Sequence, residues 1–464
     1  MRRLLILVTV ASGTTGALFA CSSTAPSPAA PPAVDGGDAD RADAGDLDAG
    51  RADSEADADG GDEDYVVPDA SVVCETSPCV IGIAGSWDGY CAILSDGRAA
   101  CWGANDSGQL GKDPETSSVT TPSLVEGLTD VVELATNIEN TCARTGDGTV
   151  YCWGQAALVH MGTAADASEP PFGVITTPTR EAAVPPANSI TVGGGFACVT
   201  VSDGSLSCWG TNERRELGRG TSEQSMLPPA RATLVTRSAA TAIGGLGRTF
   251  VIATDGSVLS WGANTAFGAN NYLLGRDTSE DPNERPTLVR LLARVRDIST
   301  AFSHSCGVAG RFVECWGSNA NGQLGRGTFE ALSHLPGRTI LADVTDDEDV
   351  DASTTGHDVP VQVVTGQAHS CAVLGSGRVY CWGSAGAGRV LGTQVNVGAV
   401  QGRPTRIDGF SGPVVRLAAG NGGGCALLRT GAVECWGSND RGQLGMGSID
   451  ITPHPAPIRL TFPQ

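Results

Sequence analysis

The chain has 464 residues with 30 basic and 51 acidic side chains, and its formal net charge at pH 7 is −21. This balance argues against a nucleic-acid partner, because phosphate binding relies on clustered lysine and arginine, which the sequence lacks. The 15 cysteines indicate an oxidising compartment, and therefore an exported protein.

Residues 1–20 have the pattern of a secretion signal. Two arginines precede an apolar stretch, Leu4–Val10, and small residues follow it. The segment Leu18–Cys21 is similar to a bacterial lipobox, in which cleavage precedes a cysteine that is then lipidated. We therefore expect a lipoprotein of the cell envelope, anchored in the outer membrane through Cys21 and facing the periplasm or the cell surface.

Residues 21–70 have the composition of a disordered linker. They are mainly alanine, proline, glycine, serine and aspartate, and residues 34–64 carry 13 acidic side chains against two arginines. Such a segment cannot bury a core and repels itself. We interpret it as a tether that lifts the following domain from a membrane. An aspartate-rich calcium site is the alternative, but no ligand spacing supports it.

Seven cassettes that end in a Trp-Gly pair recur through the remaining chain. Their tryptophans are separated by between 51 and 66 residues, and a period near 50 residues indicates a repeat architecture. We assign these tryptophans to packing between repeats. They are Trp102, Trp153, Trp209, Trp261, Trp316, Trp382 and Trp436.

Six cassettes contain two cysteines whose separation follows the length of the hairpin loop between them, so each pair is expected to lie directly opposite. In the fourth cassette both cysteines are replaced together, by Phe250 and Ser260. We predict hairpin disulfides rather than buried thiols or a metal site, and a further small loop between Cys74 and Cys79. The predicted hairpin pairs are Cys91–Cys101, Cys142–Cys152, Cys198–Cys208, Cys306–Cys315, Cys371–Cys381 and Cys425–Cys435.

The cassettes are followed by the motif Gly-x-Asn-x-x-Gly-Gln-Leu-Gly, best preserved at residues 103–111, 317–325 and 437–445. A variable loop and a Pro-x-x-Val/Leu segment come next. These segments suit four short antiparallel strands per repeat, and four-stranded sheets repeated radially make a β-propeller. The sequence therefore predicts an all-β, seven-bladed propeller over residues 71–464.

The combined motif resembles that of the regulator of chromosome condensation repeat family. The resemblance covers residues 80–464 and implies a seven-bladed propeller. Only the fifth and sixth repeats keep the family's histidine, at His304 and His369, and the second repeat lacks Gly-Gln-Leu-Gly. The chain is also similar to β-lactamase inhibitory protein II in blade number and export, which makes an exported inhibitor one alternative.

The chain ends in a strand-like segment, Pro455–Leu460, with no further repeat after it, whereas the first repeat begins near Val80 without such a segment. We therefore predict that this C-terminal strand completes the first blade. Sharing a strand between the two ends would close the ring and remove two exposed sheet edges.

Candidate binding residues lie in the turns just before the cassette cysteines. Trp87, Tyr90, Phe302, His304 and His369 are expected to share one rim of the propeller and to form a protein-binding surface there. Packing in the core, or hydrogen bonding within the blade turns, is the alternative for each of them.

No nucleophile elbow, Walker loop, His-Glu-x-x-His or paired-carboxylate motif occurs, so we expect no catalytic residue, cofactor or metal. We predict a monomeric, non-enzymatic propeller on the cell envelope that binds an unidentified protein. The alternatives are the exported inhibitor, a structural envelope lipoprotein, and an exported lyase or glycosidase with its site in the central funnel.

Overall fold

The computed structural model describes residues 71–464 apart from 156–157, 159–172, 221–225, 266–271, 279–281, 291, 331, 342–357 and 387. The expected secretion signal, Cys21 and the acidic linker lie outside the described residues. All of the described residues belong to one compact unit, Tyr65–Gln464.

Short extended segments separated by turns form seven antiparallel sheets of four strands each, and each sheet uses strands that are consecutive in sequence. The strands are given from the inner to the outer one. Blades one and two consist of β1 (Val80–Gly85), β2 (Gly89–Leu94), β3 (Ala99–Ala104) and β4 (Ser118–Leu124), and of β5 (Val131–Thr136), β6 (Asn140–Thr145), β7 (Val150–Gln155) and β8 (Val174–Arg180). Blades three and four consist of β9 (Ala187–Val192), β10 (Phe196–Val201), β11 (Leu206–Gly210) and β12 (Leu227–Arg231), and of β13 (Ala239–Gly244), β14 (Arg248–Ala253), β15 (Val258–Gly262) and β16 (Asn283–Leu288).

The last three blades repeat this order. They consist of β17 (Val295–Thr300), β18 (His304–Ala309), β19 (Phe312–Ser318) and β20 (Leu332–Arg338); β21 (Pro360–Thr365), β22 (His369–Leu374), β23 (Val379–Ser384) and β24 (Val400–Ile407); and β25 (Val414–Ala419), β26 (Gly423–Leu428), β27 (Val433–Asn439) and β28 (Asp450–Arg459).

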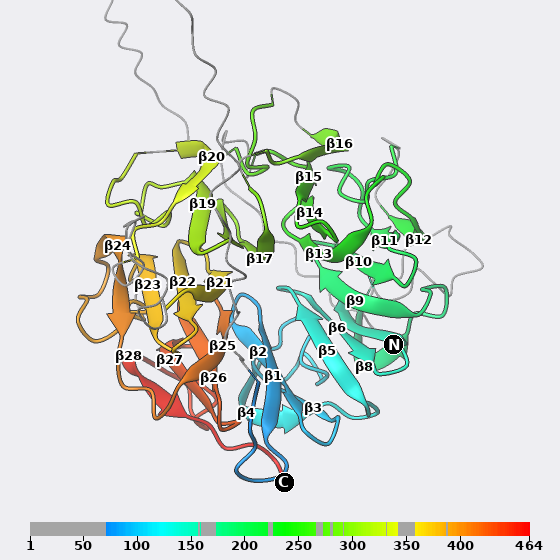
Figure 1. The fold of residues 1–464 in the computed structure, drawn as a ribbon. Helices are drawn as coiled ribbons and strands as arrows, with labels where there is room; N and C mark the ends of the chain where they lie inside the picture. Colours follow the sequence, from blue (N-terminus) through cyan, green and yellow to red (C-terminus); the bar gives the residue numbers. More distant parts are fainter. Residues whose placement is uncertain are drawn as a thin grey trace, which may run out of the picture. The chain divides into compact units, whose positions relative to one another are not determined.

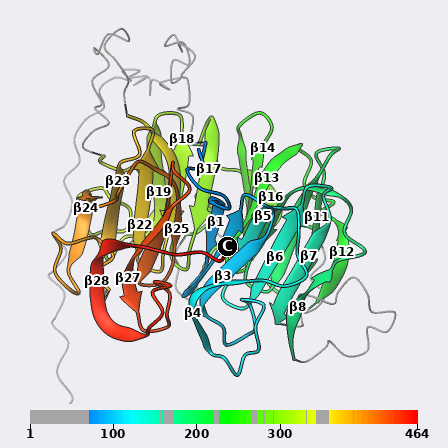
Figure 2. The same cartoon turned by 90° about the horizontal axis from the view of Figure 1, so that it is seen from below.

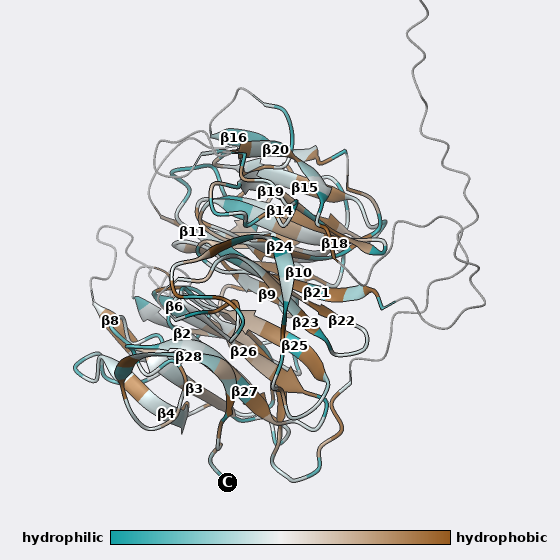
Figure 3. Cartoon of the chain, turned by 90° about the vertical axis from the view of Figure 1, so that its left-hand side faces the viewer, coloured by the Kyte–Doolittle hydropathy of each residue, from teal (hydrophilic) through white to brown (hydrophobic). Residues whose placement is uncertain are grey.

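The seven sheets are arranged radially around a central axis (Figure 1). The first strand of every blade lies innermost and the fourth lies at the periphery, and Figure 2 shows the sheets standing side by side from another direction. In Figure 3, hydrophobic colours run along strands such as β25 and β27, whose faces are covered by neighbouring sheets. The predicted seven-bladed propeller with four-stranded blades is confirmed.

The hairpin between the second and third strands positions the cysteines as the sequence predicts. In blade one, Gly97 has a φ of 81°, in the left-handed region that the loop requires, and the register pairs Cys91 with Cys101. Their Cα atoms are 4.1 Å apart, which is the close spacing of a non-hydrogen-bonded pair. In blade five, the shorter loop has Gly310 in the left-handed region. All seven predicted pairs are compatible with disulfides.

We expect peptide mapping under non-reducing conditions to link each cysteine peptide to the partner in its own hairpin, since each pair is buried and directly opposed. Cys74 should be linked to Cys79. Free thiols in the protein purified without reductant, or links between different blades, would contradict the pairing.

Each tryptophan of the repeats packs at the interface between its own blade and the preceding one. The Trp153 indole is buried against the first blade, and its Nε1 donates a hydrogen bond to the carbonyl oxygen of Gln109, at 2.8 Å. That oxygen lies in the Gly-Gln-Leu-Gly motif of the preceding blade. The same kind of bond to the preceding blade is made by Trp102, Trp261, Trp316, Trp382 and Trp436.

Trp209 differs from the other six tryptophans. Its blade follows the second repeat, which lacks Gly-Gln-Leu-Gly, and its Nε1 has no hydrogen-bond partner among the described residues. The indole is nevertheless buried at the same kind of interface. Among the described residues, this tryptophan is therefore held by apolar packing, whereas a hydrogen bond adds to the packing at the other interfaces.

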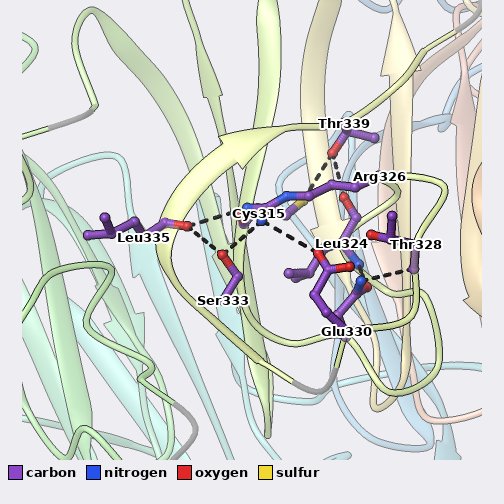
Figure 4. A network of polar contacts seen from close by, with 9 residues as sticks. Cys315, Leu324, Arg326, Thr328, Glu330, Ser333, Leu335 and Thr339 are labelled. Atoms are coloured by element: carbon purple, nitrogen blue, oxygen red, sulfur yellow. Dashed lines mark hydrogen bonds and ion pairs between the residues drawn. The ribbon is translucent and has the colours of Figure 1, made fainter.

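The outer strands are secured by polar contacts from the loop before them. In blade five, Arg326 directly follows Gly-Gln-Leu-Gly, and its guanidinium donates to the carbonyl oxygens of Cys315 and Leu335 and, at 2.8 Å, to Ser333 Oγ (Figure 4). Thr339 Oγ1 donates to Leu324 O in the same network. These bonds satisfy carbonyl groups where the ladder between β19 and β20 is interrupted.

The prediction for ring closure is wrong. The C-terminal strand β28 pairs with β27 inside the seventh blade, and the first blade is completed by β4. The Pro-x-x-Val/Leu segment is the outermost strand of its own repeat rather than the opening strand of the next. Proline lacks an N–H group and is therefore suited to an edge strand or a bulge. The outer strands contain Pro122, Pro178, Pro229, Pro286, Pro336, Pro404 and Pro457.

Blades one and seven meet through the same kind of interface as the other neighbours. Trp102 Nε1 donates to Gln443 O at 3.1 Å, and the residues after β28 reach back so that the Phe462 ring packs against Trp102, with centroids 5.5 Å apart. On the other side, Val80 N donates to Gly431 O at 3.1 Å. Side-chain packing and individual hydrogen bonds close the ring, and no sheet spans both blades.

Candidate protein-binding face

The turns between the first and second strands of all seven blades converge around the axis and line a cavity of about 160 Å³, which we call the mouth. Because neighbouring strands are antiparallel, the loops between third and fourth strands open on the same side of the ring. We call this side the mouth face. The mouth is lined by residues 85–87, 136–138, 192–194, 244–246, 300–302, 365–367 and 419–421.

Two aromatic side chains meet at the mouth. Trp87 follows β1 in blade one, Phe302 follows β17 in blade five, and their ring centroids are 4.7 Å apart with the planes tilted by 58°. These blades are not neighbours, so the rings meet across the opening. Both side chains are half-buried. Ile138 and Leu246 occupy the equivalent positions of blades two and four and add apolar surface to the mouth.

Three of the five predicted binding residues are buried instead. Tyr90 is 1% exposed and stacks on Trp102 with centroids 5.9 Å apart, and burial raises the pKa of its hydroxyl. His304 and His369 are buried in β18 and β22. All three side chains lie on the second strand, beyond the turn, where they face a neighbouring blade. The rim prediction therefore places only Trp87 and Phe302 correctly.

His304 takes part in a contact between blades. His304 Nε2 lies 2.8 Å from Ser370 Oγ, and Ser370 Oγ donates to Gln323 O at 3.0 Å, which joins blades five and six. Burial is the main cause that lowers the pKa of His304 to about 3, and it lowers that of His369 to about 4. Both imidazoles are therefore neutral at physiological pH.

Arg248 occupies the corresponding position in blade four. It is fully buried, its Nε donates to Thr300 Oγ1 at 3.0 Å, and its guanidinium also donates to Ala301 O in blade five. The bonds hold the backbone that leads directly to Phe302. Arg248 thus fixes the backbone that positions Phe302, and it does not itself line the mouth.

Carboxylates gather on one side of the mouth. Asp88 directly follows Trp87 and is half-buried, and its pKa is raised to about 6, chiefly by burial and then by the charge of Asp440, with Asp106 adding to it. Arg441 acts in the opposite direction, but its guanidinium forms an ion pair with Asp106. The mouth is therefore bordered by excess negative charge where blades seven and one meet.

A second hollow of about 190 Å³ lies beside the mouth over blades three and four. Leu246 lines both hollows, and Arg214 and Glu216 line the second. Glu216 replaces the glutamine of Gly-Gln-Leu-Gly and accepts hydrogen bonds from Thr211 Oγ1 and Arg214 N, each at 2.8 Å. Its carboxylate therefore organises its own loop.

Among the residues that the structure describes, no group of three or more His, Cys, Asp or Glu side chains is placed to hold a metal ion. Within the described ranges, no helix is long and apolar enough to cross a membrane. The features that distinguish the mouth face are its aromatic pair, the apolar side chains around it and the carboxylates at one side.

Sequence reasoning missed several contributors to this face. Ile138 and Leu246 stand at the same distance before the cassette as Trp87 and Phe302, so alignment of the repeats could have found them. The alignment also places Asp88 and Glu139 one residue further on. The contact between Trp87 and Phe302 carries no signal in the sequence, since it joins two distant repeats.

Taken together, the seven four-stranded blades and their loop motif define a repeat β-propeller with a potential binding surface at one end of its axis. Two models of the regulator of chromosome condensation (RCC1) repeat match the chain, one at residues 80–109, 361–389 and 414–443 and the other at residues 96–142. The chain therefore carries repeats of this type.

Curated proteins are similar in sequence to much of this chain. The human E3 ubiquitin-protein ligase HERC2 is 28% identical over 367 residues, which are 76% of this chain and 7% of HERC2. The ultraviolet-B receptor UVR8 of Arabidopsis thaliana is 29% identical over 248 residues, 52% of this chain and 53% of the receptor. This chain thus spans from 7% to about half of the length of these relatives.

Solved structures show the same architecture. Human WBSCR16 superimposes with a TM-score of 0.65 at 19% identity, covering 79% of this chain and 95% of that one. Prp20p of Saccharomyces cerevisiae gives a TM-score of 0.64, also at 19% identity, covering 82% and 87%. At this identity the likeness concerns the fold.

Proposed function

We propose that this protein is a non-enzymatic, protein-binding propeller that uses its mouth face and is held at the cell envelope by a lipid on Cys21. The observation that carries the proposal is the pair of half-buried aromatic rings, Trp87 and Phe302, at the centre of the mouth. Binding energy at protein interfaces is concentrated in a few such aromatic anchors near the centre.

The distribution of exposed apolar side chains supports the same face. Of thirteen exposed large hydrophobic residues in the described part of the chain, nine lie at the mouth, in loops between third and fourth strands, or at the start of a fourth strand. Phe329 is 51% exposed and Ile451 is 92% exposed. Such a concentration on one side is typical of an interaction surface.

The related proteins agree with a binding role. Prp20p binds Gsp1p and histones, and it has also been solved bound to Kap60. These partners are not carried over to this chain, because its sequence predicts an export signal and its net charge is −21. What is carried over is the use of the propeller as a rigid protein-binding scaffold.

Replacing Trp87 or Phe302 with alanine should weaken capture of the partner from envelope extract by more than about 1 kcal/mol, or roughly fivefold. Each substitution removes an aromatic anchor at the mouth and leaves the seven blade tryptophans in place. The measurement is a pull-down with the full-length protein, followed by affinity determination for the captured protein.

Ile81→Ala serves as the matched control. Ile81 is an exposed apolar residue near the opposite end of the inner strand β1. The control should bind as the unmodified protein does, and all variants should keep their melting temperature. Loss of capture with Ile81→Ala but not with Trp87→Ala would place the interface on the other face.

The lipid anchor is tested separately. Cys21→Ala should move the protein from the membrane fraction to the soluble fraction and abolish metabolic labelling with a palmitate analogue, because the substitution removes the thiol to which the lipid is attached. Membrane association that survives the substitution would show that another segment anchors the protein.

A further inference from the structure

We infer that the partner segment bound at the mouth presents an aromatic or large aliphatic side chain with a lysine or arginine next to it. This inference rests on the proposed function and specifies the chemistry of the segment that would be bound. It follows from two features that lie side by side on the mouth face. One is the cavity of the mouth itself, called the apolar cup below, and the other is the group of carboxylates around Asp88, called the carboxylate border.

The apolar cup has the dimensions of one side chain. Its volume is about 160 Å³, and an apolar cavity of roughly 150 Å³ is large enough to hold benzene. Trp87, Phe302, Ile138 and Leu246 supply its apolar surface, from four different blades. The cup therefore fits a single protruding ring or branched aliphatic group better than an extended flat surface.

The polar groups around most of the mouth are uncharged and already engaged. Asn137 Oδ1 accepts from the backbone N–H groups of Glu139 and Asn140, and its amide donates to Gly193 O. Asn421 N donates to Trp87 O. These bonds shape the rim, and they leave the net charge of the mouth to the carboxylates beside it.

The carboxylates follow a pattern when the seven turns are aligned. The residue after the tip of each turn is Asp88 in blade one and Glu139 in blade two, whereas the other five blades have glycine, serine or alanine there. At this position of the turn, negative charge thus occurs only in the two neighbouring blades that carry Trp87 and Ile138 at their tips. The neutral positions are Gly195, Gly247, Ser303, Ala368 and Gly422.

A nearby cation would stabilise the charged form of Asp88, which burial and neighbouring carboxylates disfavour. The negative charges of Asp440 and Asp106 help to raise its pKa, and Arg441, which acts in the opposite direction, is ion-paired with Asp106. A lysine or arginine from a partner would offset this negative charge and could rest against the Trp87 ring, which attracts cations through its π-system. The apolar neighbour of that cation would then enter the cup.

A second copy of this chain fits the mouth poorly. The chain carries a net charge of −21, so two copies brought face to face would repel each other. Like charges facing each other across an interface oppose association. Charge complementarity therefore favours a different protein with a basic residue at its tip.

The test uses the full-length protein and four synthetic Gly/Ser decapeptides that carry Phe-Lys, Phe-Gln, Phe-Glu or Ala-Lys at their centre. Binding is followed through protection of Trp87 from iodide quenching, since the seven other tryptophans are buried. The Phe-Lys peptide should bind about fivefold more tightly than Phe-Gln, the upper range for a partly exposed ion pair, and Phe-Glu and Ala-Lys should bind least.

Asp88→Asn should abolish the preference for Phe-Lys over Phe-Gln and leave binding of Phe-Gln unchanged. Glu126→Gln, which removes an exposed carboxylate from the opposite face, should retain the preference. In the unmodified protein the preference should decline as the pH falls through about 6, because Asp88 becomes protonated.

Equal binding of all four peptides, absence of binding up to millimolar concentrations, or a preference for Phe-Lys that Asp88→Asn leaves intact would each overturn the inference. The proposed function is judged by a different result, the capture of an envelope protein that depends on Trp87. Capture that depends on Trp87 but not on Asp88 would keep the proposed function and reject the basic residue.

Discussion

Replacing Glu181 with valine should stabilise the propeller, and the gain should grow as the pH rises from about 5 to about 8. Glu181 is 2% exposed, and neither carboxylate oxygen has a hydrogen-bond partner among the described residues. Burial raises the pKa of this carboxyl group to about 8. The folded protein therefore holds a proton that the unfolded chain releases above its ordinary pKa of about 4.3.

The sign follows from proton binding. Between these two pKa values the folded state binds more protons than the unfolded state, so the free energy of unfolding falls as the pH rises, by up to about 1.4 kcal/mol per pH unit. The stabilising effect of the raised pKa is complete below the unfolded value and is lost as the pH passes the folded value. Valine removes this dependence.

The position itself explains why valine is the chosen replacement. Glu181 N donates to Val150 O at 2.9 Å, as Val125 N donates to Ala99 O at 2.9 Å in blade one. The equivalent residue is apolar in several other blades, for example Val289 and Leu460, and is the uncharged Thr339 in blade five. Unfolding by denaturant at pH 5, 6.5 and 8 measures the effect, with exposed Glu126→Gln as the control. A gain that is the same at all three pH values would contradict the titration of Glu181.

Trp153→Phe should destabilise the propeller by about 2 kcal/mol more than Trp209→Phe. Both substitutions remove similar apolar volume from an interface between blades. Trp153 also loses its hydrogen bond to Gln109 O, whereas Trp209→Phe removes a buried N–H group that has no partner among the described residues. The net value of a hydrogen bond and the cost of a buried unsatisfied donor together give this difference.

The comparison is made by denaturant unfolding of both variants under identical conditions. Trp382→Phe provides a second member of the hydrogen-bonded class, since its Nε1 donates to Gln323 O at 2.8 Å. It should behave as Trp153→Phe does. Equal losses for Trp153 and Trp209 would show that apolar packing accounts for the whole contribution of these tryptophans.

Most of the fold could be predicted from short sequence motifs. The spacing of the Trp-Gly pairs gave the number of blades, and the joint change of loop length and cysteine spacing in the fifth cassette gave the hairpin register. Both features depend on residues only a few positions apart, where turn geometry limits the arrangements. Assigning the outer strand failed, because a short edge strand carries no signal that says which of two adjacent sheets it joins.

The candidate site was less accessible to sequence reasoning. Trp87 and Phe302 lie in the turns and reach the mouth, whereas Tyr90, three residues after Trp87, is already inside the blade. Three positions along the chain, from Trp87 to Tyr90, therefore lead from the surface of the mouth to the core of the blade. The pKa of Asp88 is raised chiefly by burial and then by the charge of Asp440, which lies close to the other end of the sequence, and only closure of the propeller brings these two carboxylates together.

The prolines in all seven outer strands have a consequence for molecules at high local concentration. A ring of seven sheets exposes seven strand edges around its circumference, and each edge is a template for pairing with a neighbouring molecule. A proline in every such strand removes a donor from that template. Densely packed copies are thereby hindered from joining edge to edge into extended sheets, and the flat ends of the ring are left for recognition.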